Sequence, residues 1–115
     1  MNTAILQQYG LQFYKLDNGQ CRVKGTGNFA WLSTYVYIYR DIDDLSDFIS
    51  DLDLAISGNI NQIEDTDYGG WYGSYFSAEI ATEGMIIWQS SWEDRTIIPL
   101  VDMKEVLLSW KEFIE

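Results

Sequence analysis

The stretch "RDIDDLSDFISDLDLAISGN", residues 40–59, sets the hydrophobic period for the middle of the chain. Its apolar residues recur at steps of three and four positions, which is the spacing of one helix face. They are Ile42, Leu45, Phe48, Ile49, Leu52, Ala55 and Ile56. Asp41 can serve as the N-cap, and Gly58 can supply the left-handed residue that ends a helix. The stretch therefore predicts an amphipathic helix that stops at Gly58.

The opposite side of this helix carries acids. Asp43, Asp47 and Asp51 follow one another at i, i+4 and i+8, and Asp44 lies beside them, so the four share a solvent-facing stripe. Like charges at this spacing cost about 0.2–0.5 kcal/mol per pair, and aspartate is a poor residue for a helix interior. Helix stability therefore does not explain the stripe. It is either a solvated acidic face or a docking face for a cationic partner.

Two segments upstream alternate as strands do. In "LQFYKLDNGQCRVKG", residues 11–25, the pair Asn18-Gly19 is a strong turn signal between two short strands and predicts a hairpin. In "NFAWLSTYVYIYR", residues 28–40, aromatic side chains fall on one face and aliphatic ones on the other. This alternation predicts a third strand, central in the sheet.

The second half of the chain adds strands and a last helix. "NINQIED", residues 59–65, is a further strand candidate, and "SYFSAEIAT" with "GMIIWQSSW" predicts a hairpin that turns near Glu83-Gly84. "VDMKEVLLSWKEFIE", residues 101–115, carries an apolar stripe at helical spacing, and Asp102 with Glu105 resembles a capping box.

The predicted order is β-β-β-α-β-β-β-α. It indicates an α+β fold, with a mostly antiparallel sheet of about five to six strands and two amphipathic helices packed on it. A chain of 115 residues suffices for one core but not for two, and no linker divides it. We expect a single domain over residues 1–115.

Charge is distributed unevenly along the chain. The formal net charge is -11, yet residues 1–40 carry four Lys or Arg against one acid, whereas residues 41–94 carry thirteen acids and no Lys or Arg. Such a surface repels nucleic-acid phosphates and anionic lipid head groups, and it attracts basic proteins. We therefore expect a basic protein partner, no nucleic acid and no membrane.

The N-terminal segment, the lack of a long apolar run and the cysteine indicate where the protein is located. "MNTAILQQYG" lacks the basic start and apolar run of a secretory signal, and no apolar segment approaches the roughly 20 residues that span a bilayer. The one cysteine, Cys21, cannot form an internal disulfide and suits a reducing compartment. These features predict a cytoplasmic protein.

Catalytic equipment is sparse. The chain has no histidine, which removes Ser-His and Cys-His sites and histidine metal ligands. "DTDYGG", from Asp65, starts like a calcium loop, but its glycine is late and its twelfth position is Phe76 rather than glutamate. Carboxylate pairs for catalysis need two different environments, which an outward acidic face does not supply. We expect no enzyme activity, no cofactor and no metal, and keep a small carboxylate enzyme as the least favoured alternative.

The loop "DTDYGGWYG", residues 65–73, mixes acids with aromatic residues. Tyr68, Trp71 and Tyr72 lie beside Asp65 and Asp67 in a stretch that no core periodicity accounts for. Tyrosine and tryptophan are common anchors of protein interfaces. Together with the helix stripe, this loop is the predicted partner-binding surface; the alternative is that Trp71 and Tyr72 cover one end of the core.

The ending "IIPLVDMKEVLLSWKEFIE" resembles that of immunity proteins from bacterial polymorphic-toxin and contact-dependent growth inhibition systems. Several such families end in a similar "P-L-x-x-x-x-x-L-L-x-x-W-x-x-F" helix, which Pro99, Leu100, Leu107, Leu108, Trp110 and Phe113 approximate. The resemblance covers about a fifth of the chain and describes a core helix, so it assigns no binding residues.

The resemblance implies a role. An immunity protein of this kind binds and neutralises one cognate toxin, often a basic nuclease. We therefore expect a stoichiometric inhibitor, monomeric when free, whose acidic and aromatic surface meets a basic toxin domain. The alternative is an acidic adaptor or chaperone-like module that binds another basic protein.

Overall fold

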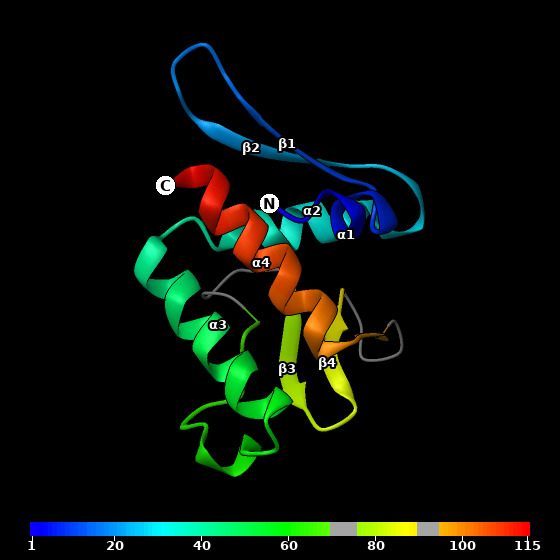
Figure 1. Ribbon diagram of the computed structural model, residues 1–115. Coiled ribbons are helices and arrows are strands. Elements are labelled where there is room, and N and C mark those ends of the chain that lie inside the picture. The colour runs from blue at the N-terminus through cyan, green and yellow to red at the C-terminus, as the bar shows by residue number, and fades with distance from the viewer. Residues whose placement is uncertain (70–75, 90–94) are drawn as a thin grey trace. The chain divides into compact units, whose positions relative to one another are not determined.

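The computed structural model describes residues 1–69, 76–89 and 95–115 (Figure 1). The chain forms two compact units: Met1–Leu45 together with Glu105–Glu115, and Ser46–Lys104. Each unit has a small antiparallel sheet of its own.

The first unit begins with a short helix and a hairpin. Its elements are α1 (Thr3–Gln8), β1 (Leu11–Lys15), β2 (Cys21–Gly25), a 3-10 turn (Gly27–Phe29) and α2 (Ala30–Ile38). Leu11 pairs with Gly25 and Lys15 with Cys21, and Gly19 adopts a φ of 85° in the turn between the strands. The predicted hairpin is therefore confirmed. Helix α1 was not predicted, because six residues are too few to display a period.

The predicted central strand over residues 28–40 is wrong, because most of this segment is helix α2. Its buried residues are Leu32, Tyr35, Val36 and, just beyond the helix, Tyr39. These positions follow the three- and four-residue steps of a helix face. The alternation that suggested a strand is also present, because nine of the thirteen positions of the segment are apolar and both periods fit them.

Helix α3 (Ile42–Ile56) confirms the prediction from the stretch at 40–59. Asp41 caps it, since Asp41 Oδ1 accepts hydrogen bonds from the N–H groups of Asp43 at 2.9 Å and Asp44 at 3.1 Å. Gly58 has a φ of 84°, and the helix closes with a bond from Asn59 N–H to the Leu54 carbonyl at 2.8 Å. The buried positions of α3 are Leu45, Phe48, Ile49 and Leu52.

Helix α4 (Leu100–Ile114) confirms the predicted last helix but starts earlier than the capping box implied. Asp102 lies inside the first turn instead of before it. Within the first unit, Trp110 of α4 is fully buried and its indole N–H donates to the Tyr39 carbonyl at 2.8 Å. The Phe13 ring of β1 lies 5.0 Å from the Trp110 ring. Trp110 therefore has both an apolar and a polar role in this core.

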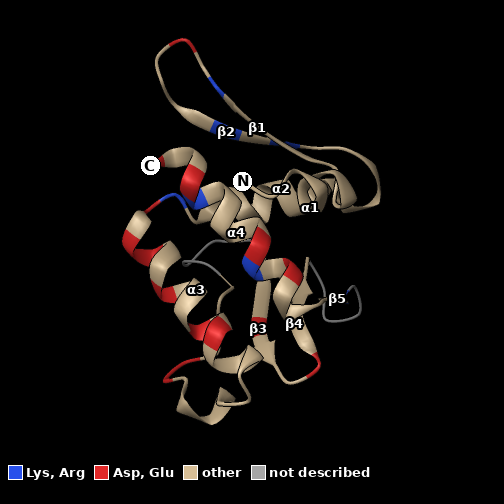
Figure 2. Cartoon of the chain, in the orientation of Figure 1, with Lys and Arg blue, Asp and Glu red and all other residues tan. Residues whose placement is uncertain are grey.

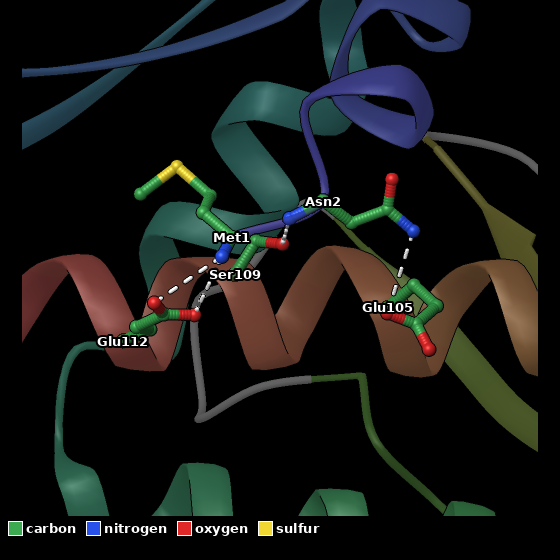
Figure 3. A network of polar contacts seen from close by, with 5 residues as sticks. All are labelled: Met1, Asn2, Glu105, Ser109 and Glu112. Carbon is green, nitrogen blue, oxygen red and sulfur yellow. Dashed lines mark hydrogen bonds and ion pairs between the residues drawn. The ribbon is translucent and has the colours of Figure 1, made fainter.

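The residues before α1 are tied to α4 by polar contacts (Figure 3). The α-amino group of Met1 lies 3.0 Å from a carboxylate oxygen of Glu112, and the N–H of Asn2 donates to Ser109 Oγ at 3.0 Å. The Asn2 amide also reaches Glu105 at 3.5 Å. Ser109 is buried, so the bond from Asn2 supplies its hydroxyl with a partner.

The second unit is built on a three-stranded antiparallel sheet in the order β3-β4-β5. The strands are β3 (Ser77–Ala81), β4 (Gly84–Trp88) and β5 (Arg95–Ile98). The hairpin of β3 and β4 closes with Ala81 opposite Gly84, which confirms the predicted turn at Glu83-Gly84. Four successive residues of β4 are buried, as expected for the central strand of this sheet.

The predicted strand over residues 59–65 is wrong. Its start forms a 3-10 turn (Ile60–Gln62) that is followed by the buried C-cap residue Ile63. Ile60 and Ile63 are three positions apart, which is one turn of such a helix. The chain reaches the sheet only later, where Tyr68 N–H donates to the Ala78 carbonyl at 2.9 Å and Ile80 N–H to the Thr66 carbonyl at 3.0 Å.

The α+β class holds, but the single sheet of five to six strands with two helices is wrong. The described residues form two separate sheets, of two and three strands, and four α-helices. The segment at 28–40 is the main cause, because it was expected to be the central strand and instead forms a helix. No helix of the described residues is long and apolar enough to cross a membrane.

Candidate functional site

The acids of α3 occupy two different environments. Asp43, Asp44 and Asp47 are exposed, whereas Asp51 is half-buried. Asp43 and Asp44 lie in the first turn, where the positive end of the helix dipole favours carboxylates. Figure 2 shows acids along the length of α3. The predicted stripe is thus exposed at its first three positions, whereas Asp51 is only partly exposed.

Tyr68 explains the burial of Asp51. The Tyr68 hydroxyl donates a short hydrogen bond to Asp51 Oδ2, and the Tyr68 ring stacks on Phe48 with 4.0 Å between ring centroids and 17° between planes. Phe48 is fully buried. Tyr68 is therefore held both by its ring and by its hydroxyl, which joins the predicted loop to the predicted helix face.

The loop before Tyr68 is shaped by its own acids. Asp65 Oδ1 accepts the N–H of Asp67 at 2.9 Å, and Asp67 Oδ1 accepts the N–H of Gly69 at 3.0 Å. Such aspartate turns order the backbone and leave each carboxylate exposed to solvent. Gly69 lies close to the backbone at the start of β3, where an added Cβ would lie 2.9 Å from the Phe76 carbonyl oxygen. The carboxylates of Asp65 and Asp67 are therefore each held in position by a hydrogen bond to the backbone.

Helix α3 and this loop together line an open depression of about 490 Å³, the acidic depression. Its lining residues are Asp47, Ser50, Asp51, Glu64, Asp65, Asp67 and Tyr68. Five of these seven residues are carboxylates and none is a lysine or arginine. The acidic depression brings together five of the predicted site residues, namely Asp47, Asp51, Asp65, Asp67 and Tyr68. Asp43 and Asp44 are not among its lining residues, and Trp71 and Tyr72 lie outside the described residues.

Three residues near this site were missed by sequence reasoning. Ser50 and Glu64 line the acidic depression, and Glu79 of β3 forms an isolated antiparallel bridge with Asp67. Directly opposed like charges destabilise a sheet, so this pair adds negative charge where stability alone would not favour it. Glu64 adjoins Asp65 in the sequence and could have been included from that neighbourhood. The register that brings Glu79 opposite Asp67 carries no sequence signal.

The acidic depression offers negative charge and hydrogen-bond acceptors. Within the described ranges, no three acids or cysteines are grouped so that they could hold a metal ion. The depression is open and supplies no histidine to take or give a proton. Fixed carboxylates beside a tyrosine can instead accept hydrogen bonds from lysine and arginine side chains.

Comparison of the chain with protein-family models, curated proteins and solved structures finds no match in any of the three.

Proposed function

We propose that this chain is a stoichiometric protein inhibitor that binds a basic toxin domain through the acidic depression. The observation that carries the proposal is that five carboxylates line one depression together with Tyr68, without a cation among the lining residues. The interface is expected to include Trp71 and Tyr72 as further aromatic anchors. In this proposal the chain has no enzymatic activity of its own.

Fixed geometry supports recognition rather than simple solubility. Asp65 and Asp67 are each held by a backbone N–H, and Asp51 is held by Tyr68, so partner binding would order few side chains. Because less conformational entropy is lost, more of the interaction energy is available for affinity. Exposed acids that serve solubility alone need no such fixation.

The choice of a toxin as the basic partner rests on the resemblance of the last helix to immunity proteins. A negatively charged surface can compete with nucleic acid for the basic groove of a nuclease. The chain would then act in the cytoplasm of a bacterium, where it protects the cell that makes it. A basic partner with no toxic activity would instead favour the adaptor alternative.

Co-expression with the neighbouring reading frame tests the proposal. The neighbour's product is produced in a bacterial host alone and together with this chain, and both growth and a one-to-one complex are measured. We expect the product alone to stop growth and this chain to restore it. A neighbour that is harmless alone, or toxicity that this chain does not relieve, would contradict the toxin-inhibitor proposal.

A charge-matched pair of variants assigns the effect to the acidic depression. Asp47→Asn, Asp65→Asn and Asp67→Asn remove three charges, and asparagine keeps the side-chain oxygens that accept the loop N–H groups. The control variant combines Asp17→Asn, Glu83→Gln and Glu115→Gln, three exposed positions outside the depression. We expect the first variant to lose protection and the control to keep it. Equal loss in both would mean that net charge, not the depression, sets binding.

A further inference from the structure

The lysines and arginines among residues 1–40, unlike Lys111, are not paired with described acids. Ion pairs in the described part of the chain join the Met1 amino group to Glu112, Lys104 to Asp53, and Lys111 to Glu115. None of the four lysines and arginines among residues 1–40 takes part in such a pair with a described carboxylate. Because the chain has 18 acids for 7 bases, every cation could have an acidic partner, so cations without one are unexpected.

Two of these cations share one aromatic ring. The guanidinium carbon of Arg40 lies 4.5 Å from the centroid of the Tyr37 ring, and that of Arg22 lies 5.2 Å from the same centroid. Arg22 comes from β2, Tyr37 from α2, and Arg40 from the residues just after α2. Contact with the face of a ring helps to hold a guanidinium group in place, and its outer N–H groups can still donate hydrogen bonds.

A hydrogen-bond chain fixes the arrangement further. Arg22 Nη2 donates to Gln20 Oε1 at 3.0 Å, and the Gln20 amide donates to the Tyr37 hydroxyl at 3.3 Å. Gln20, Arg22, Tyr37 and Arg40 form the Tyr37 cluster. Its two positive charges repel each other and have no carboxylate partner among the described residues.

One polar atom of the Tyr37 cluster, Arg22 Nε, is left without an acceptor. It is buried and has no hydrogen-bond partner, alone in this among the side-chain nitrogen and oxygen atoms of the described ranges. Buried donors without an acceptor are rare in native proteins. Because Arg22 Nε is covered by the protein itself, an anion would contact Arg22 at its terminal N–H groups rather than at Nε. A bound anion would also relieve the repulsion between the two guanidinium groups.

We propose that the Tyr37 cluster is a carboxylate-binding site for an acidic segment of a protein. Guanidinium groups bind carboxylates through two parallel N–H bonds, and two oriented arginines select a segment with acidic side chains close together. The net charge of -11 opposes the approach of a nucleic acid or an anionic membrane, whose charge is far denser. This surface has the opposite sign to the acidic depression, so the proposal goes beyond the inhibitor function and does not depend on it.

The test follows the arginine side chains directly by NMR. The Nε–Hε signals of the isotope-labelled chain are recorded during titration with a hexa-aspartate peptide, and with a hexa-serine peptide as the uncharged control. We expect the signals of Arg22 and Arg40 to shift and saturate with hexa-aspartate and to stay unchanged with hexa-serine. No shift with hexa-aspartate would overturn the proposal.

Substitutions separate a built site from general attraction. Arg40→Gln should weaken hexa-aspartate binding about tenfold, the loss of one charge-assisted contact. The control, Lys24→Gln, removes an exposed cation of β2, the strand that also carries Arg22, but one that is not in the cluster. It should change the affinity less than about twofold. Equal effects of the two substitutions would overturn the site in favour of diffuse electrostatics.

A third variant and two other probes complete the test. Tyr37→Leu keeps both charges and removes the ring, so we expect weaker binding with an unchanged fold, the latter checked by circular dichroism. Wild-type affinity in a folded Tyr37→Leu variant would contradict a role for the ring. Stronger binding of a single-stranded oligonucleotide or of phosphatidylserine vesicles than of hexa-aspartate would overturn the assignment to an acidic protein segment.

Discussion

The two units differ in net charge and in the groups that contact their charged side chains. The first unit holds five Lys or Arg and seven Asp or Glu, a net of -2, whereas the second holds two and eleven, a net of -9. Cations of the first unit lie over aromatic rings, as Lys15 does over Phe113 and Arg40 over Tyr37. Several acids of the second unit are held by backbone N–H groups or by a tyrosine hydroxyl. The cations are thus oriented by the faces of aromatic rings, and the acids by hydrogen-bond donors.

The largest expected effect lies in the first unit. Trp110→Ala should lower the free energy of unfolding by about 3–5 kcal/mol, because it leaves a cavity at a fully buried site and leaves the Tyr39 carbonyl without its donor. Chemical denaturation of wild type and variant measures the change. Trp110→Phe is the matched variant, since it keeps most of the ring and loses the hydrogen bond, and should cost less. A loss below about 1 kcal/mol for Trp110→Ala would show that this tryptophan is not a core residue.

The next effect divides the acids of α3. Asp51→Ala should cost about 1–3 kcal/mol, because the partly buried Tyr68 hydroxyl loses a charged acceptor. Asp47→Ala, one turn earlier and exposed, should change the free energy of unfolding by no more than about 0.5 kcal/mol. Equal effects at the two positions would return Asp51 to the solvated stripe that the sequence predicted.

A smaller loss of stability than that of Asp51→Ala is expected at the helix cap. Asp41→Ala should cost about 1 kcal/mol, because two N–H groups at the start of α3 lose their acceptor. Asp41→Asn keeps that oxygen and should be nearly neutral. Thermal unfolding of both variants gives the comparison. If asparagine costs as much as alanine, the charge of Asp41 matters more than its hydrogen bonds.

The sequence was sufficient where one period dominated. In α3 the apolar residues recur at steps of three and four with acids between them, which was enough to predict the helix. Asn18-Gly19 marks the turn of the first hairpin. It was insufficient over residues 28–40, where nine of the thirteen residues are apolar and both the helix period and the strand period fit them. Only the three-dimensional packing of Tyr35 and Val36 distinguishes the two there.

The candidate site was predictable in composition and not in geometry. The acids and Tyr68 stood out as a charged, aromatic loop beside an acidic helix. The aspartate turns at Asp65 and Asp67 could also have been foreseen, because an aspartate side chain often accepts a hydrogen bond from the backbone N–H two residues later. By contrast, Tyr68 and Asp51 are 17 positions apart, and nothing local links them. Long-range pairs of this kind depend on the fold as a whole.

The central claim is that the acidic depression captures a basic partner. Stopped-flow mixing with the toxin domain recovered by co-expression measures the association rate as salt rises from 0.01 to 0.15 M, where the Debye length shrinks from about 30 Å to about 8 Å. We predict a steep fall for wild type and for the Asp17, Glu83 and Glu115 control variant, and a shallower one for the Asp47, Asp65 and Asp67 variant. A wild-type rate that does not depend on salt, or equal slopes for the two variants, would contradict the claim.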